Sequence, residues 1–468
     1  MIKRMPKKKL GICITILLLA IAAVLSFLLF GKPKAQREDY RQISSRTYDT
    51  VFLSMYPLDT YREQDFTDYR EMTVLKTAYC IPDFSVVKQY MKRVAKSGNS
   101  ISTVYLGIRP DKASPEDLLA LSQLYPSAGF EIILAYPSAD YWKSLSEEEY
   151  AEMLGIYCDF LSALQEQPNL RYYFYGSQAW LIANPHNYRD HWLVEENIAR
   201  EIMLHSDTIH EYLVTPERAA AFSRQLTELT EKIRNAPEPK PDLSDHCVVF
   251  LGDSVIGNFT DSLSVPGVVT ALSDATVYNC GYGGNSASMH PECPTALPGI
   301  SQALVEGDLS LLPEDTQVYS GISSYLTDPP KDKKMCVVIY YGLNDYFAGY
   351  RITSEEDPYD ISTYAGAIRT AVATLRAGLP EAQIILCTPN YCRQFNYGTE
   401  PHGEGGYILE QYADAVIALS EELETDLLDT YHGFGINKDN WSDFIPDQVH
   451  PNAAFRFLIG ESLTNLIR

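Results

Sequence analysis

The C-terminal half of the chain repeats one pattern, in which a short apolar run is followed by a turn and then by a stretch with helical periodicity. Strands are expected at residues 247–251, 276–279, 336–341, 383–387 and 425–429, and helices at 361–377, 407–422 and 451–467. Apolar runs without polar alternation are typical of strands buried on both faces, as in a parallel sheet covered by helices. Residues 247–468 are therefore predicted to form one α/β domain, with ligands bound at the carboxyl ends of its strands.

Polar and glycine-rich segments stand where these strands end. Gly-Asp-Ser closes the first run and ends at Ser254, which is the candidate nucleophile. A serine hydroxyl needs a base within hydrogen-bond reach, and His450 can serve because a neutral imidazole takes a proton on one nitrogen while a carboxylate holds the other. Asp447 lies three residues before His450, so one turn of chain can bring the pair together.

Acyl transfer also passes through a tetrahedral oxyanion that needs preorganised donors. The candidates are the backbone N–H of Ser254, the backbone N–H of Gly284 and the side-chain amide of Asn344. Asp253 and Asp345, which stand beside two of these residues, are expected to hold loops rather than to take part in the chemistry.

Four segments together resemble the blocks of the SGNH, or GDSL, hydrolase family. They are Gly-Asp-Ser, Asn-x-Gly-x-x-Gly, Gly-x-Asn-Asp and Asp-x-x-His-Pro, and they occur in the family's order within about 247–455. The resemblance implies a three-layer α/β/α fold similar to flavodoxin and esterase or acyltransferase chemistry. It implies that Ser254 is the nucleophile, that Gly284 and Asn344 complete the oxyanion hole, that His450 is the base and that Asp447 orients it.

The resemblance has one departure and one ambiguity. Many members have glycine after the aspartate of the last block, where this chain has Gln448. In the second block Gly281, Gly283 and Gly284 compete for the oxyanion role; the register of the motif selects Gly284, and Gly283 is the second choice.

The first forty residues predict a membrane anchor. Residues 1–9 are basic and are expected to form a cytoplasmic tail, and residues 10–30 are an apolar run about as long as a bilayer-spanning helix. Positive charge before the span predicts an N-terminus inside and a catalytic domain outside. The alternative is a signal peptide cleaved after the small-residue pattern at 20–22, which would release the protein as a secreted enzyme.

Residues 41–234 are expected to form a second α/β domain of accessory role. Strands are predicted at 51–55, 102–108, 131–136 and 170–175, and helices at 114–124, 147–165 and 216–234. The proline-rich residues 235–246 read as a linker. A polar loop with aromatic neighbours at 180–191 either lines a groove or is an ordinary structural loop. No internal repeat is evident in the sequence.

The net charge and the cysteine spacing limit the classes of ligand and partner that the sequence predicts. The net charge is −23, although the first forty residues carry eight Lys/Arg against two Asp/Glu, and an acidic ectodomain argues against nucleic acid. The nine cysteines show no metal-binding spacing, and no metal or organic cofactor is implied. Cys247, Cys336 and Cys387 are expected in the core, Cys13 falls in the span, and disulfide pairing of the others stays open.

The sequence therefore predicts a membrane-anchored extracytoplasmic serine esterase that removes acyl groups, such as acetyl, from envelope carbohydrate. One alternative is an O-acyltransferase that passes the acyl group to a cell-surface polysaccharide. A second is a glycan-binding module whose hydrolase fold has lost catalysis. The expected partners are an acyl-ester substrate, a glycan and the membrane; the sequence names no protein partner.

Overall fold

The computed structural model describes residues 33–57, 59–65, 72–205, 212–236, 242–291, 295–314, 321–330 and 332–468. The predicted cytoplasmic tail 1–9 and membrane span 10–30 lie outside these residues, as do residues 237–241 of the predicted linker. Among the helices in the described ranges, none combines the length and apolarity that a bilayer crossing requires.

The chain packs as two compact units. Of the described residues, the first unit contains those up to Ala135 with those of Glu147–Tyr175 and Ala199–Arg224, and the second contains those of Tyr136–Ser146, Gly176–Ile198 and Gln225–Arg468. The division follows packing rather than chain order, because two short segments from the first half of the sequence group with the second unit. The domain boundaries expected from the sequence stay predictions.

A six-stranded sheet organises the first unit, with the order β2-β1-β3-β4-β5-β6. Only β6 runs antiparallel to its neighbour, and the other pairs are parallel. The strands are β1 (Thr50–Ser54), β2 (Val74–Lys76), β3 (Thr103–Ile108), β4 (Gly129–Leu134), β5 (Leu170–Phe174) and β6 (Leu213–Val214). The four strands predicted here are confirmed within two residues, whereas the short β2 and β6 were not predicted.

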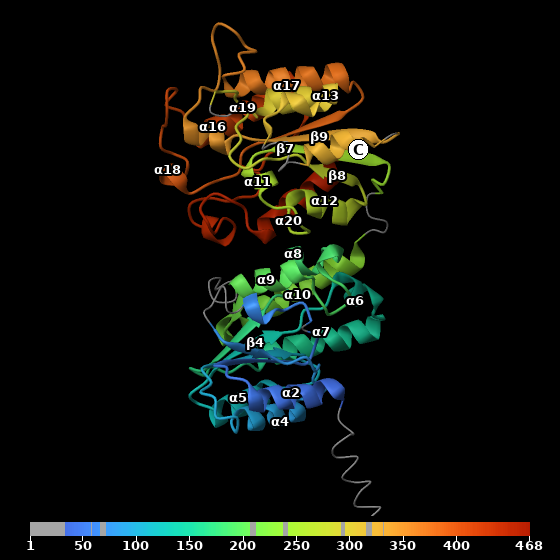
Figure 1. Ribbon diagram of the computed structural model, residues 1–468, viewed down its shortest axis with the longest axis vertical. Coiled ribbons are helices and arrows are strands. Elements are labelled where there is room, and N and C mark those ends of the chain that lie inside the picture. Colours follow the sequence, from blue (N-terminus) through green and yellow to red (C-terminus); the bar gives the residue numbers. More distant parts are fainter. Residues whose placement is uncertain are drawn as a thin grey trace, which may run out of the picture. The chain divides into compact units, whose positions relative to one another are not determined.

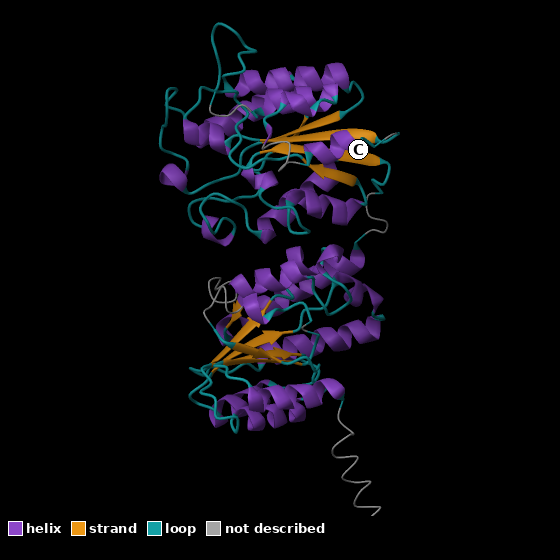
Figure 2. Ribbon diagram, viewed as in Figure 1, coloured by secondary structure: helices purple, strands orange, loops and turns teal. Residues whose placement is uncertain are grey.

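Helices, drawn in purple in Figure 2, connect and flank these strands in the described residues up to 235. They are α2 (Lys34–Ser45), α4 (Phe84–Val94), α5 (Pro115–Leu124), α6 (Ala139–Ser144), α7 (Glu147–Ser162), α8 (Ala179–Ile182), η1 (Pro185–Asn187), α9 (Glu196–His205) and α10 (Pro216–Asn235). The helix α5 begins as its sequence predicts, because the Ser114 side chain accepts a hydrogen bond from Asp117 N–H and Pro115 occupies the first turn.

The second unit contains a parallel five-stranded sheet with the order β11-β10-β9-β7-β8. Its strands are β7 (His246–Gly252), β8 (Thr276–Asn279), β9 (Lys334–Tyr340), β10 (Gln383–Cys387) and β11 (Asp426–Leu428). Every residue of β7 is buried, which explains its unbroken apolar sequence. The predicted α/β fold with a parallel sheet is confirmed, and its strand order is that of flavodoxin.

Helices cover both faces of this second sheet (Figure 1). The helices α12 (Val265–Ser273) and α20 (Ala453–Leu466) pack together on one face, and α13 (Leu297–Glu306), α17 (Tyr364–Gly378) and α19 (Leu409–Glu422) lie on the other. Shorter helices follow the strands: α11 (Ser254–Gly257), η3 (Leu309–Leu311), α15 (Ile322–Thr327), α16 (Leu343–Ala348), α18 (Gln394–Tyr397) and η4 (Trp441–Asp443). The helices α12 and α13 were not predicted from the sequence.

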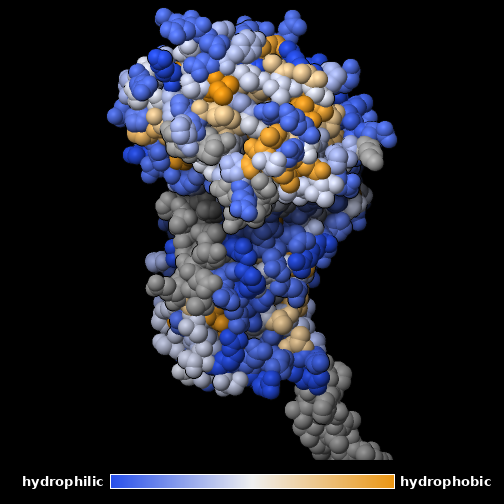
Figure 3. Space-filling view, turned by 45° about the horizontal axis from the view of Figure 1, so that its top comes forward, coloured by the Kyte–Doolittle hydropathy of each residue, from blue (hydrophilic) through white to orange (hydrophobic). Residues whose placement is uncertain are grey.

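The three cysteines that the sequence placed in the core are buried there. Cys247, Cys336 and Cys387 are buried in the core of the second unit, as predicted, and all seven cysteines of the described ranges are free thiols. The large hydrophobic side chains exposed in these ranges are Leu124, Leu311, Tyr359 and Ile361. The face drawn in Figure 3 is mostly hydrophilic, with hydrophobic residues in small groups.

The two sheets share one strand order. In both, the second strand of the chain lies at an edge, and the first, third, fourth and fifth strands follow it across the sheet. The chain therefore uses the same strand topology twice, although its sequence shows no internal repeat. The first sheet adds β6 beyond this shared order.

Candidate active site

Ser254 lies at the first position of α11, two residues beyond the end of β7. Asp253 caps this helix, because its side chain accepts a 2.9 Å hydrogen bond from Val255 N–H, and the serine hydroxyl is not used as the cap. A side chain at Gly252 would place its Cβ 2.7 Å from Ile256 Cγ1, so the close turn needs a glycine. Since β7 and β9 are neighbours, Ser254 and the segment after β9 leave the sheet at the same edge.

His450 and Asp447 complete a hydrogen-bonded relay with Ser254. His450 Nε2 lies 2.9 Å from Ser254 Oγ, and His450 Nδ1 lies 2.6 Å from Asp447 Oδ2. The second carboxylate oxygen accepts hydrogen bonds from the N–H groups of Val449 (3.0 Å) and His450 (2.6 Å). The fold thus brings together three residues that the sequence singled out.

The environment of Asp447 keeps it ionised. Burial acts to raise its pKa, but the hydrogen bonds from the His450 N–H, the His450 imidazole and the Val449 N–H together lower the pKa below its ordinary value. The Asp447 side chain is 54% exposed and that of His450 is 24% exposed. An ionised carboxylate against Nδ1 orients the imidazole and stabilises the imidazolium that forms when Ser254 gives up its proton.

Residues after β10 hold the loop that carries the base. Asn390, which is fully buried, donates from Nδ2 to the carbonyl of Val449 (3.2 Å), and the Arg393 N–H donates to the carbonyl of Gln448 (2.9 Å). Gln448 has φ +77°, a conformation that glycine adopts far more easily. Sequence reasoning missed Asn390 and Arg393, although their position after an apolar strand was a usable signal.

Asn344 is the second residue of α16, and its side-chain amide makes one hydrogen bond within the protein. Its Nδ2 donates a 2.7 Å hydrogen bond to the carbonyl of Asn285 in the loop after β8. An amide carries two N–H donors, so the second can serve an oxyanion. This contact also ties the helix after β9 to the glycine loop.

The glycine loop after β8 approaches Ser254. A Cβ on Gly283 would lie 4.0 Å from the Cβ of Ser254 and 2.6 Å from Asn258 Oδ1, so the chain passes close to the candidate nucleophile. Gly284 is exposed, has φ +83° and would meet no atom within 4 Å of an added Cβ. The choice of Gly284 over Gly283 as oxyanion donor stays a prediction.

Two buried aspartates fasten the loops of the site. Asp345 accepts hydrogen bonds from the N–H groups of Ala287 and Ser288 (both 2.9 Å) and from the Ser288 hydroxyl (2.6 Å). Burial raises the pKa of Asp345, and burial together with the nearby charge of Asp345 raises the pKa of Asp253 to about 7, against a hydrogen bond from Val255 N–H. Their contacts match the loop-holding role expected from the sequence.

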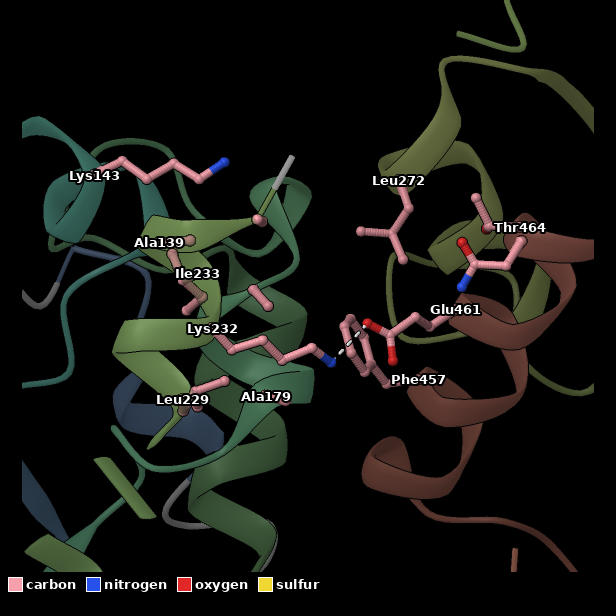
Figure 4. A pocket seen from close by; sticks show the side chains of 13 residues that line it. Ala139, Lys143, Ala179, Leu229, Lys232, Ile233, Leu272, Phe457, Glu461 and Thr464 are labelled. Atoms are coloured by element: carbon pink, nitrogen blue, oxygen red, sulfur yellow. Dashed lines mark hydrogen bonds and ion pairs between the residues drawn. The ribbon is translucent and has the colours of Figure 1, made fainter. Parts of the chain in front are cut away.

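The cavity drawn in Figure 4 is a separate feature of the second unit. It contains about 280 Å³ and is lined partly by apolar side chains that include Leu229, Ile233, Leu272 and Phe457. None of the five candidate residues lines it, so it is not part of the candidate active site.

A comparison with protein families identifies the C-terminal domain. Residues 250–455 match the family model described as the GDSL-like lipase/acylhydrolase family. This domain belongs to that family. The predicted family and the predicted class of enzyme are confirmed, and the GDSL-like domain is that of an ester-bond hydrolase. The match does not reach the first unit's sheet.

Solved structures that are similar to about half of this chain include named esterases. The M. smegmatis aryl esterase is 18% identical, with 47% of this chain and 97% of that chain covered and a TM-score of 0.33. A carbohydrate acetylesterase from Sinorhizobium meliloti, Est24, is 15% identical, with 47% and 97% covered and a TM-score of 0.31. A possible lipase from Chitinophaga pinensis is 18% identical, with 47% and 96% covered and a TM-score of 0.30. A search of curated proteins found no significant match.

Proposed function

We propose that this protein is a membrane-anchored, outward-facing serine esterase that removes small acyl groups, such as acetyl, from carbohydrate. The observation that carries the chemistry is the relay in which Ser254 Oγ, His450 and Asp447 are joined by contacts of 2.9 and 2.6 Å. The family of the domain supplies the reaction class, since its members are lipases and acylhydrolases by description.

The proposed reaction has two halves. Ser254 Oγ attacks the ester carbonyl while His450 Nε2 takes the hydroxyl proton, and Asp447 stabilises the imidazolium. The oxyanion is held by N–H donors from Ser254, Gly284 and Asn344. Its collapse breaks the ester C–O bond, and His450 returns the proton to the departing alcohol. Water then attacks the acyl-serine with His450 again as base, which releases the acid and the free serine.

The location and the substrate are supported by the sequence and by exposure. The basic segment followed by the apolar run at 10–30 favours an anchored enzyme with its hydrolase domain outside. The partial exposure of His450 and Asp447 suits a substrate that is itself part of a larger molecule, because the acyl group can be reached from solvent. The acidic ectodomain favours a neutral substrate over a polyanion.

Labelling with a fluorophosphonate probe tests the nucleophile and its base. The adduct is expected on Ser254, and Ser254→Ala and His450→Ala are each expected to lower kcat for p-nitrophenyl acetate by at least about a thousandfold. His290→Ala is the matched control, because His290 Nε2 donates to the Ser362 carbonyl (2.9 Å) and its ring stacks on Tyr350. An adduct on another residue, or equal labelling of His450→Ala and wild type, would refute the proposal.

The fate of the acyl-serine distinguishes hydrolysis from O-acyl transfer. The enzyme is loaded with an acetyl donor in the presence of neutral oligosaccharides, and acetate and acetylated sugar are measured together. For an esterase, the rate of acetate release is expected to stay unchanged with every acceptor. Acetylated sugar formed at the expense of acetate would instead support an acyltransferase.

A further inference from the structure

A second cavity is built from the polar loop that the sequence singled out. It contains about 230 Å³ and has two walls, one from the start of α6 (Ser138–Asp140 and Lys143) and one from the chain at 183–191. None of the candidate active-site residues lines it. Of the two alternatives left open for this loop, a groove is the one that the structure shows.

The second wall is a small hairpin with a fixed shape. Tyr188 pairs with Val194 in an antiparallel bridge, and the Arg189 N–H donates to the Leu193 carbonyl (2.8 Å). At the tip, Asp190 Oδ1 accepts hydrogen bonds of 2.7 Å from the N–H groups of Trp192 and Leu193. A wall held in this way loses little conformational entropy when a ligand binds.

Hydrogen bonds join the two walls. The Ser138 N–H donates to the His191 carbonyl (3.0 Å), and Ser138 Oγ lies 3.4 Å from His191 Nδ1. Ser138 Oγ also caps α6 by accepting from the Tyr141 N–H (3.3 Å). On the other side of the hairpin, Asn187 Nδ2 donates to the carbonyls of Trp180 and Leu181. The cavity therefore has walls fixed relative to each other.

The lining is charged but balanced. Lys143 and Arg189 stand against Asp140 and Asp190, and Arg189 is further matched by Glu195, whose Oε2 is 2.9 Å from its Nε. The lining has no excess of positive charge that would favour a polyanion such as a phosphorylated ligand. A neutral ligand whose groups both donate and accept hydrogen bonds uses carboxylate, ammonium and imidazole together.

Aromatic residues accompany the polar lining. Tyr188 lines the cavity with its hydroxyl donating to the Tyr136 carbonyl (2.8 Å), so its ring stays in a fixed position. The rings of Tyr141 and Trp192 pack 4.8 Å apart, beside Asp140 and His191 in the sequence. Sugars present both hydroxyl groups and apolar C–H faces, and the fixed polar groups of the lining together with the Tyr188 ring suit them.

His191 is not placed as a hydrolytic base. His191 Nδ1 lies 3.4 Å from Ser138 Oγ, and Oδ1 of the neighbouring Asp190 accepts from backbone N–H groups. His450 differs, because its Nε2 contacts Ser254 and its Nδ1 contacts the Asp447 carboxylate. The strand ends of the two sheets also differ in sequence. The strand that corresponds to β7 is β1, and it is followed by Met-Tyr-Pro at 55–57 instead of Asp-Ser.

We propose that the cavity between Ser138–Lys143 and the hairpin at 188–194 binds a neutral sugar unit of an oligosaccharide. The site goes beyond the proposed hydrolysis and does not depend on Ser254 being the nucleophile. Its role would be to hold a glycan, with Asp140 and His191 as polar contacts to the sugar hydroxyls.

Titration of the full chain with neutral tetrasaccharides tests this site. The Ser254→Ala protein in detergent micelles is titrated with chitotetraose, cellotetraose and maltotetraose, and binding is followed by saturation-transfer NMR and calorimetry. At least one is expected to bind, with Asp140→Asn and His191→Gln each weakening affinity by about tenfold, the effect of losing one hydrogen bond to a charged or strongly polar group. Asp159→Asn and His186→Gln are the matched controls, since both are exposed and neither lines the cavity.

Three outcomes would overturn the proposal: no binding of any of the three sugars, equal binding by all four variants, or a fluorophosphonate adduct on Ser138. Labelling of Ser254 in the Asp140→Asn chain is expected to equal that of wild type. Because labelling and sugar binding are measured separately, failure of the esterase proposal and failure of the sugar site are distinguishable.

Discussion

Replacing Asp253 by asparagine is expected to remove a pH dependence from the stability of the hydrolase fold. Asp253 is completely buried beside Ser254, and burial, aided by Asp345, raises its pKa from 3.8 to about 7. Each tenfold difference in proton affinity between the folded and unfolded chain amounts to about 1.4 kcal/mol. The protonated carboxyl therefore stabilises the folded state by up to about 4 kcal/mol relative to the ionised one.

The sign follows from the direction of the shift. Because the folded pKa is raised, this stabilisation is fully present below pH 3.8 and is lost as the pH rises through about 7. The free energy of unfolding of the wild type is thus expected to fall between pH 4 and pH 8. Asp253→Asn keeps an oxygen that can accept from the Val255 N–H but has no proton to lose, so its stability is expected to change less over this range.

Urea unfolding at pH 5 and pH 8 measures the effect, with hydrogen-exchange mass spectrometry of peptides from β7 and β9 as the readout. These peptides report on the sheet of the hydrolase fold rather than on the whole chain. Asp414→Asn is the control, because Asp414 is exposed on α19. If wild type and Asp253→Asn lose the same stability between the two pH values, the burial argument is wrong.

Three other predictions concern the loops of the candidate site. Gln448→Gly is expected to stabilise the protein by about 1 kcal/mol and to keep full labelling of Ser254, because glycine adopts φ +77° easily. Gln448→Val is expected to lower the stability and the labelling rate, which thermal unfolding and fluorophosphonate labelling measure. Asn344→Ala is expected to lower kcat about a hundredfold with little change in KM, and unchanged kcat would remove Asn344 from the oxyanion hole. Gly284→Ala is expected to lower kcat more than Gly283→Ala when variants of equal thermal stability are compared; the reverse order would make Gly283 the donor.

The proximity of the candidate residues was predictable because their motifs are short and local. Asp447 and His450 are three residues apart, so their pairing depends on one turn of chain, and the same holds for Gly252 and Ser254 at the end of β7. The strand ends of a parallel sheet meet at one edge, which is why motifs separated by up to 196 residues were expected together. Periodicity therefore predicted the sheet, and the motifs at its strand ends predicted that Ser254, Asp447 and His450 lie together.

The features that were not predicted from the sequence depend on tertiary contacts. The helix α12 reads Val-Pro-Gly-Val-Val-Thr-Ala-Leu-Ser, whose β-branched residues resemble a strand, and it forms because Ser264 caps it and α20 packs against it. Support of the His450 loop by Asn390 and Arg393 crosses nearly sixty residues of chain. The common strand order of the two sheets leaves no repeated sequence, since many different apolar residues satisfy the same buried positions.

The shared strand order gives the chain two sets of strand ends that differ in sequence. Each sheet offers its own set of strand ends, but only the second carries Gly-Asp-Ser and the relay behind it. Because the relay is formed by residues that follow β7 and by the loop before α20, substitutions at the strand ends of the first sheet are expected to leave its contacts unchanged.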